Sequence, residues 1–181
     1  MNKSVLKMTQ IAMLAALSLV LVTFVHFPIF PTAPFLEYDM ADVPVLIGGF
    51  LLGPIEGLAI LLVVSVYQAF ALGGNGWVGL VMHFVASGLL VVISAVIFRW
   101  KKTVASMIIG LILGCIAMTA AMIPMNLTLT VYFLGTPREV VEQMMLPVII
   151  PFNLIKSSAN STLAALVYFP LKRLVKLTEK A

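Results

Sequence analysis

Long apolar stretches separated by short polar segments fill most of the chain. They cover residues 11–30, 43–72, 77–98, 104–134 and 146–171. Each is long enough for a membrane helix, since about 20 apolar residues cross the hydrocarbon core of a bilayer. The second stretch is interrupted by Gly53 and Pro54, two residues that break helices. The pattern predicts an all-α integral membrane protein.

Positively charged residues indicate how these helices are threaded through the membrane, because lysine and arginine collect on the cytoplasmic side. The clusters are Lys3 and Lys7; Arg99, Lys101 and Lys102; and Lys172, Arg173, Lys176 and Lys180. If all of them are cytoplasmic, an even number of crossings separates neighbouring clusters. Three apolar stretches lie between the first two clusters, so the interrupted stretch 43–72 must cross twice.

The predicted fold is a bundle of six transmembrane helices with both termini in the cytoplasm, and residues 1–181 form a single domain. The expected helices cover residues 5–27, 43–53, 55–72, 77–98, 104–134 and 146–172. The second and third helices are short for a crossing and require thinned lipid or shelter from neighbouring helices. The longest outer loop covers residues 27–42.

Composition indicates lipid, and not nucleic acid, as the main surroundings. Apolar residues make up 62% of the chain and charged residues 10%, whereas soluble domains have roughly half and one quarter. The net charge of +4 lies at the ends of the apolar stretches and forms no stripe, which excludes a nucleic-acid interface. The single cysteine, Cys115, allows neither an internal disulfide nor a thiolate metal site.

Lys156 is the strongest candidate for binding a ligand, because it lies inside the last apolar stretch. A cation within a membrane helix is costly unless it is paired or faces water. Asn153 and Asn160 lie about one turn away on the same helical face, so this face offers several donors and acceptors to a polar ligand. The alternative is that Lys156 extends to the membrane boundary, but it lies far from both ends of its helix.

Asn126 is the second candidate. It follows Pro124 in the fifth helix, and a proline bends a helix and frees a backbone carbonyl. The alternative role for Asn126 is a hydrogen bond between helices, which is common for asparagine in membranes. His83 has no second metal-ligating residue at a suitable spacing, so we assign it to packing or to the wall of a ligand site.

The first outer loop is apolar and is stiffened by several prolines. A loop of this composition is expected to cover a hydrophobic site as a lid, and the alternative is a loop resting on the membrane interface. Asp39 and Asp42 at its end could form a metal site or an acid–base pair, but their place before Pro44 favours helix caps. Glu56 is likewise expected to cap the third helix.

Ala12 and Ala16 form a face of small residues on the first helix, which allows another helix to approach closely. This face either docks a partner or packs inside the bundle. The chain contains no nucleotide-binding motif, no zinc motif and no Ser-His-Asp arrangement. An enzymatic function therefore has little support, and no cofactor is expected.

Several short segments, in this order and spacing, resemble the substrate-binding S-components of energy-coupling factor (ECF) vitamin transporters, of the riboflavin-specific type. The segments are 32–39 with 42–44, 48–54, 135–139 and 151–156. The resemblance covers nearly the whole chain and implies that riboflavin binds near the outer face. The residues implied to contact it are Thr32, Ala33 and Pro34, which close over the flavin, and Asn126, Asn153 and Lys156, which hydrogen-bond its polar atoms.

The resemblance also implies partners and a location. Ala12 and Ala16 would dock on a transmembrane coupling subunit that joins two ATPases, in the cell membrane of a prokaryote. Three alternatives stay open. The same fold could bind another vitamin, such as pyridoxine, hydroxymethylpyrimidine or a folate-like compound; an intramembrane enzyme could use Lys156 or His83; or the protein could bind no ligand.

Overall fold

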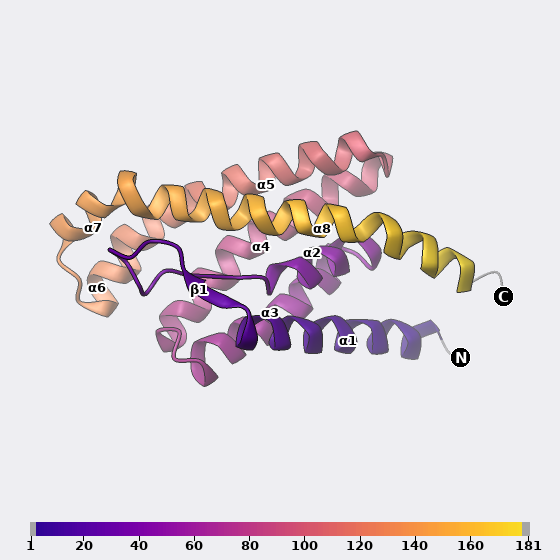
Figure 1. Cartoon of the computed structure of the whole chain (residues 1–181), viewed down its shortest axis with the longest axis horizontal. Coiled ribbons are helices and arrows are strands. Elements are labelled where there is room, and N and C mark those ends of the chain that lie inside the picture. The colour runs from indigo at the N-terminus through magenta and orange to yellow at the C-terminus, as the bar shows by residue number, and fades with distance from the viewer. Residues whose placement is uncertain (1–2, 179–181) are drawn as a thin grey trace.

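The computed structural model describes residues 3–178, with side chains for residues 4–172. Lys180 of the predicted basic tail lies outside the described residues, as do the side chains of Lys3, Arg173 and Lys176. Nearly all of the described chain is helical (Figure 1). The elements are α1 (Lys3–Phe24), β1 (His26–Pro28), β2 (Glu37–Asp39), α2 (Asp42–Leu51), α3 (Pro54–Ala71), α4 (Gly76–Lys101), α5 (Val104–Met125), α6 (Val131–Leu134), α7 (Arg138–Met144) and α8 (Ile150–Thr178).

Five helical segments of the described chain are long and apolar enough to cross a membrane, and α2 is a shorter apolar helix. The prediction of an all-α membrane bundle is therefore confirmed. Two of the long segments contain a π-helical stretch, η1 (Asn126–Thr130) before α6 and η2 (Met145–Ile149) before α8. Pro147 lies within η2, and Pro124 lies in α5 two residues before η1. A proline lacks an N–H and disturbs the regular hydrogen-bond ladder near it.

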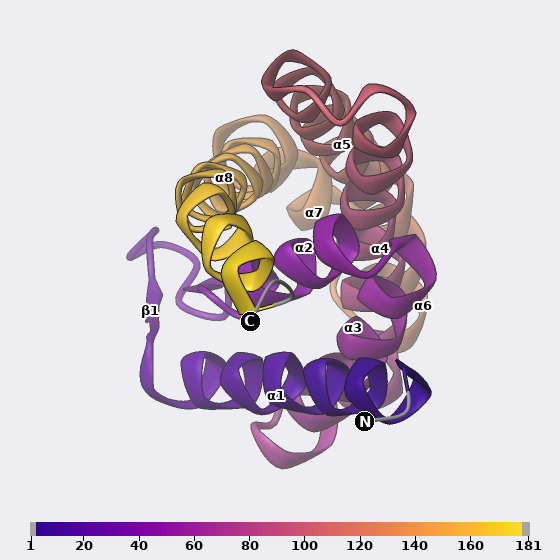
Figure 2. The same ribbon diagram turned by 90° about the vertical axis from the view of Figure 1, so that its right-hand side faces the viewer.

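The interrupted stretch 43–72 is divided into α2 and α3. Gly53 lies between them with φ of 139°, a conformation that favours glycine. Pro54 begins α3, where its missing N–H leaves no hydrogen bond unmade. Glu56, expected to cap α3, lies in its first turn and pairs with Lys7 of α1. Residues 42–50 of α2 are all buried, and α2 lies among the other helices (Figure 2), so protein shelters this short helix.

The loop after α1 contains a small antiparallel hairpin that the sequence did not predict. β1 pairs with β2 so that His26 is opposite Asp39 and Phe27 is opposite Tyr38. The rings of Phe27 and Tyr38 lie 5.3 Å apart between centroids. We call residues 25–41 the lid segment.

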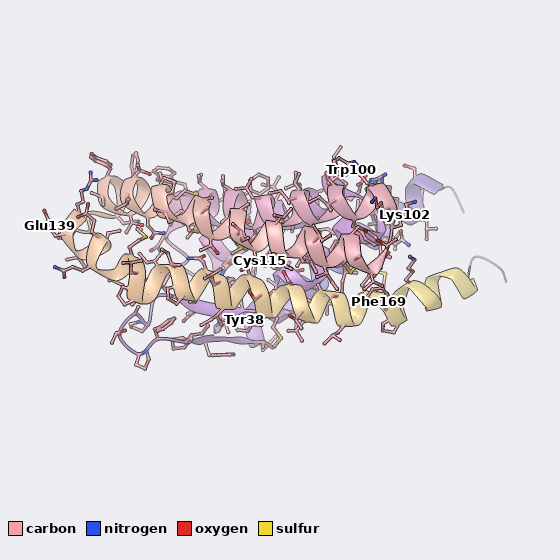
Figure 3. All side chains as sticks on the ribbon, turned by 90° about the horizontal axis from the view of Figure 1, so that it is seen from above. Tyr38, Trp100, Lys102, Cys115, Glu139 and Phe169 are labelled. Carbon is pink, nitrogen blue, oxygen red and sulfur yellow. The ribbon has the colours of Figure 1, made fainter. Side chains whose placement is uncertain are left out.

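The two ends of the bundle differ in charge. Arg99, Lys101 and Lys102 lie at the end where α1 begins and α8 ends. Glu139 lies at the opposite end (Figure 3). This arrangement agrees with the grouping of basic residues that the topology prediction used.

Helices α4 and α5 pack closely at Gly110 and Gly114, two small residues spaced four apart on α5. A Cβ atom at Gly114 would lie 2.9 Å from the carbonyl oxygen of Leu90 and 2.8 Å from its Cδ1 atom. The carbonyl oxygen belongs to the backbone of α4, so it cannot move aside unless the helices separate.

We expect Gly114→Val to lower the free energy of unfolding by about 1–3 kcal/mol, because overpacking strains both helices. The measurement is the thermal-unfolding midpoint of the detergent-solubilised protein. Ala120→Val adds side-chain volume to an exposed position of α5 and is expected to change stability by less than about 0.5 kcal/mol. Equal midpoints for the two variants would contradict the close approach.

Candidate functional site

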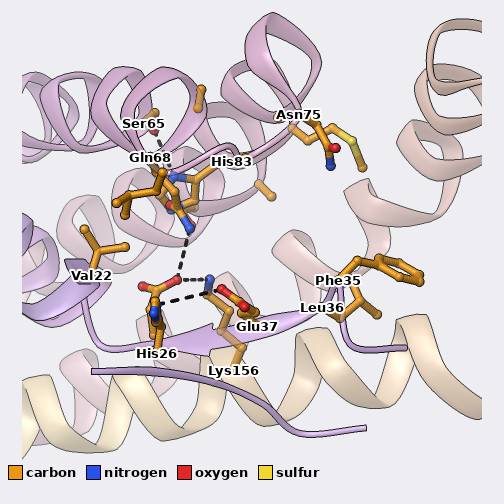
Figure 4. Close-up of a pocket in the computed structure, with 18 of the residues that line it drawn as sticks. Val22, His26, Phe35, Leu36, Glu37, Ser65, Gln68, Asn75, His83 and Lys156 are labelled. Carbon is orange, nitrogen blue, oxygen red and sulfur yellow. Dashed lines mark hydrogen bonds and ion pairs between the residues drawn. The ribbon is translucent and has the colours of Figure 1, made fainter. Parts of the chain in front are cut away.

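A cavity of about 400 Å³ lies between the lid segment and helices α3, α4 and α8. Its polar wall includes residues from all four (Figure 4). They are Glu37 and Asp39 of β2, Gln68 of α3, His83 of α4, and Asn153 and Lys156 of α8. The apolar wall includes Val22, Leu36, Met82, Met118 and Phe152. An apolar cavity with a few converging polar groups is the usual form of a small-molecule site, and its volume lies within the usual range of about 300–1,000 Å³.

Lys156 is buried at this cavity, with 7% of its surface exposed. Its Nζ atom donates to Oδ2 of Asp39 over 2.7 Å. The side chain therefore does not extend to the boundary of the bundle, and the snorkelling alternative is excluded. The sequence indicated that a cation inside the bundle needs a partner or water, and the structure supplies a carboxylate from the lid segment. An ammonium group has three donors, so the pair with Asp39 leaves further N–H groups for a ligand.

Asp39 connects the lid segment to two helices. Its Oδ2 also accepts from Nε2 of Gln68 over 3.3 Å, and its Oδ1 accepts from the backbone N–H of Ala41 over 3.0 Å. Nδ2 of Asn160 donates to the backbone carbonyl of Asp39 over 3.0 Å. With only 1% of Asp39 exposed, these partners satisfy a carboxylate that would otherwise be costly to bury.

The interpretation of Asp42 as a helix cap is wrong. Its side chain is fully buried at the start of α2, and its carboxylate binds α4 in place of the N–H groups of its own helix. Oδ2 accepts from Oγ of Ser87 over 2.9 Å, and Oδ1 lies 3.3 Å from Nε2 of His83. Nδ1 of His83 lies 3.1 Å from Oγ of Ser65. Asp42 thus fixes the imidazole of His83 in the cavity wall.

Tyr38 fastens β2 to α8. Its hydroxyl donates to Oδ1 of Asn160 over 2.9 Å. Burial raises the pKa of the Tyr38 hydroxyl, and the nearby carboxylate of Asp39 adds to the effect. Tyr38 therefore keeps its proton at neutral and moderately alkaline pH, and the hydrogen bond to Asn160 persists there.

The structure brings Asn153 and Lys156 together at the cavity, as expected from their spacing. Nδ2 of Asn153 donates to the carbonyl of Ile149 over 2.8 Å, and its Oδ1 has no hydrogen-bond partner among the described residues. Asn126 lies outside the cavity wall: it donates to the carbonyl of Met122 and accepts from Thr130. Contact of Asn126 with a ligand stays a prediction.

The predicted lid residues lie next to the cavity wall but are not part of it. Ala33 is buried, while Thr32 and Pro34 are exposed. The neighbouring residues Phe35 and Leu36 line the cavity instead. Contact of the three predicted residues with a ligand stays a prediction.

Ala12 and Ala16 are exposed on α1, while Ala15 is buried. The small-residue face of α1 therefore points away from the bundle. Packing of this face inside the bundle, the alternative to docking, does not explain why Ala12 and Ala16 are exposed.

A second depression, of about 450 Å³, lies between α5 and α8. Most of its wall is apolar, the polar side chains are the hydroxyls of Ser158, Ser161 and Thr162, and no charged residue lines it. It offers few groups that could orient a polar ligand, so we assign the site to the cavity at Lys156.

Comparison with known proteins places these features in a family. A family profile described as "ECF transporter, substrate-specific component" matches residues 6–168. The protein named "Riboflavin transporter RibU" of Lactococcus lactis subsp. cremoris is 37% identical over 123 residues, which cover 66% of this chain and 60% of that protein. The chain thus spans less than two thirds of this relative's length.

Other relatives match over a larger share of their length. "Riboflavin transporter RibU" of Streptococcus thermophilus is 33% identical over 94% of this chain and 85% of its own. "Riboflavin transporter FmnP" of Bacillus subtilis is 30% identical over 92% of each chain. A solved structure described as "Structure and mechanism of the S component of a bacterial ECF transporter" has a TM-score of 0.80 and 32% identity, covering 96% of this chain and 99% of the other.

These matches extend over almost the whole bundle, including the lid segment and the α8 face with Asn153 and Lys156. The matching family and the named relatives are transporter components and not enzymes. The chain belongs to the family of substrate-specific components of ECF transporters.

Proposed function

We propose that this chain is the riboflavin-binding component of an ATP-driven ECF transporter and holds the vitamin in the cavity between the lid segment and α8. The observation that carries the proposal is the buried Lys156 at the wall of a largely apolar cavity, held in place by Asp39. The names of the relatives support riboflavin over other vitamins.

The chemistry of riboflavin suits these residues. The isoalloxazine ring is flat and apolar on its faces, so it can pack against side chains such as Met82, Met118 and Phe152. One edge of the ring carries two carbonyl oxygens, which accept hydrogen bonds from Lys156. Since Asp39 compensates the charge of Lys156, this part of the site favours an uncharged ligand over an anion.

We place the cavity toward the outside of the cell. The basic residues at the opposite end of the bundle support this orientation, because lysine and arginine favour the cytoplasmic side. A membrane protein in this orientation would take the vitamin from the outside through the lid segment and release it inward.

Transport then requires partner subunits. The exposed face at Ala12 and Ala16 is the proposed contact with the transmembrane coupling subunit, where small side chains allow another helix to approach. ATP hydrolysis is assigned to two ATPase subunits that bind the coupling subunit. The complete assembly would lie in the cell membrane of a prokaryote.

The test is a binding measurement on the full chain purified in detergent from cells grown with riboflavin. We expect a yellow protein that releases a fluorescent flavin on denaturation and quenches flavin fluorescence on titration. Pyridoxine, hydroxymethylpyrimidine and folate serve as competitors and are expected to displace no flavin. A colourless protein without measurable affinity for riboflavin would contradict the proposal, and stabilisation by a competitor would assign the fold to another vitamin.

A further inference from the structure

Glu37 is a charged residue of the cavity wall whose carboxylate has no lysine or arginine partner in the part of the chain that the structure describes. The other charged residues of the wall, Asp39 and Lys156, compensate each other over 2.7 Å. The ion-pair partner of Glu37 is Nδ1 of His26, at 3.8 Å. Among the carboxylate, lysine and arginine side chains of the described wall, Glu37 therefore carries the one negative charge that no lysine or arginine compensates.

The position of Glu37 differs from that of Asp39 although both belong to β2. Residues two apart on a strand point to the same side, and both side chains line the cavity. The Asp39 side chain is 1% exposed and the Glu37 side chain 51%. These exposed fractions place Asp39 and Lys156 in the closed part of the cavity and Glu37 where the wall meets solvent.

A ligand that contacts both regions needs different groups at its two ends. Lys156 donates hydrogen bonds and suits carbonyl oxygens. The carboxylate of Glu37 only accepts, and hydrogen bonds from hydroxyl groups to a carboxylate are among the stronger ones. The same carboxylate repels a second anion nearby, and no free cation in the described wall offsets that repulsion.

We propose that Glu37 is a specificity-determining residue that accepts hydrogen bonds from the polyol chain of the ligand and disfavours its phosphate ester. This inference rests on the proposed function and extends it. With the ring carbonyls of riboflavin at Lys156, the ribityl chain extends toward Glu37. In FMN the terminal hydroxyl of that chain is replaced by a phosphate, which removes a donor and adds negative charge beside a carboxylate.

The test compares the dissociation constants of riboflavin and FMN by flavin fluorescence titration of the full chain in detergent, at low ionic strength. For Glu37→Gln we expect the Kd of riboflavin to rise severalfold and the Kd of FMN to fall. The ratio of Kd for FMN to Kd for riboflavin is expected to drop roughly tenfold, since the weaker, uncharged acceptor and the lost repulsion both act in that direction.

The matched control is Glu139→Gln, which makes the same change of charge at an exposed position of α7 outside the cavity wall. It is expected to leave the ratio of the two constants unchanged. A second measurement uses the unaltered protein, in which added salt should lower the ratio because it screens the repulsion from Glu37.

The outcomes separate the two proposals. A protein that binds riboflavin but keeps the same ratio in Glu37→Gln would overturn the role of Glu37 and leave the proposed function standing. An equal drop of the ratio in Glu139→Gln would likewise overturn it, because the effect would then follow from overall charge. Absence of riboflavin binding to the unaltered protein would overturn the proposed function itself.

Discussion

Lys156→Ala is expected to raise the dissociation constant of riboflavin by about tenfold or more. A hydrogen bond from a charged donor contributes roughly 1.5–3 kcal/mol, and about 1.4 kcal/mol corresponds to a tenfold change in affinity. The same variant leaves Asp39 buried without its counter-ion, which is expected to cost about 3–5 kcal/mol of stability. Both quantities are measurable on purified protein, by flavin titration and by thermal unfolding.

A double variant separates these two effects. Lys156→Met combined with Asp39→Asn removes both charges of the pair, so we expect unfolding stability to recover relative to Lys156→Ala. Riboflavin binding should stay weak, because the donor is still missing. Lys101→Ala, at an exposed position in the last turn of α4 and outside the cavity wall, controls for the loss of a lysine and should alter neither quantity. Unchanged riboflavin affinity in Lys156→Ala would remove the central contact of the proposed site.

Ala12→Trp is expected to abolish riboflavin uptake while riboflavin binding to the purified chain stays unchanged. A tryptophan at this exposed position of α1 would prevent a helix of the coupling subunit from approaching closely. The cavity wall includes no residue of α1 near Ala12, so the binding site is not disturbed. The measurement is accumulation of labelled riboflavin by cells that contain the coupling subunit and the ATPases.

Leu17→Trp is the matched control, because Leu17 is exposed on the same helix but lies on a different face. We expect this variant to retain uptake. If Ala12→Trp cells still accumulate riboflavin at the rate of unaltered cells, the face at Ala12 and Ala16 is not the contact with the coupling subunit.

The membrane bundle was predictable because its causes are local in sequence. Apolar length predicted the helices, and the need for an even number of crossings assigned the break at Gly53 and Pro54 to a turn between two of them. The pairing of Asn153 with Lys156 at one site also follows from helical spacing alone. These features require no knowledge of contacts between distant segments.

The partners of Lys156 and Asp42 were not predictable in this way. Asp39 and Lys156 are separated by 117 positions in the chain, and Asp42 binds α4 across the bundle. Local spacing favoured helix caps for both aspartates, because an acid before a helix is usually a cap. A usable signal was present nevertheless: a cation inside a membrane bundle tends to pair with an acid, and Asp39 lies in the loop expected to cover that cation.

The lid hairpin and the π-helical stretches were missed for a different reason. Residues 36–40 alternate between apolar and polar positions, but this stretch is short and follows a segment interrupted by prolines. The hairpin also depends on contacts between distant residues, such as that of Tyr38 with Asn160. Prolines indicated irregular helix near Asn126, but they do not distinguish a bend from a wider turn.

The wide turn at η2 has a consequence for how this face of α8 can change in evolution. A regular helix rotates by about 100° per residue, so a π-helical stretch that holds one additional residue turns the segment before it relative to the segment after it. Deleting one residue within η2 would remove the additional residue and bring α7 into α-helical phase with α8. The side chains of α7 would then rotate around the helix axis, while Asn153 and Lys156 would keep their register with β2. Insertions and deletions at η2 therefore offer a way to change which side chains α7 presents at the end of the bundle without moving Asn153 and Lys156.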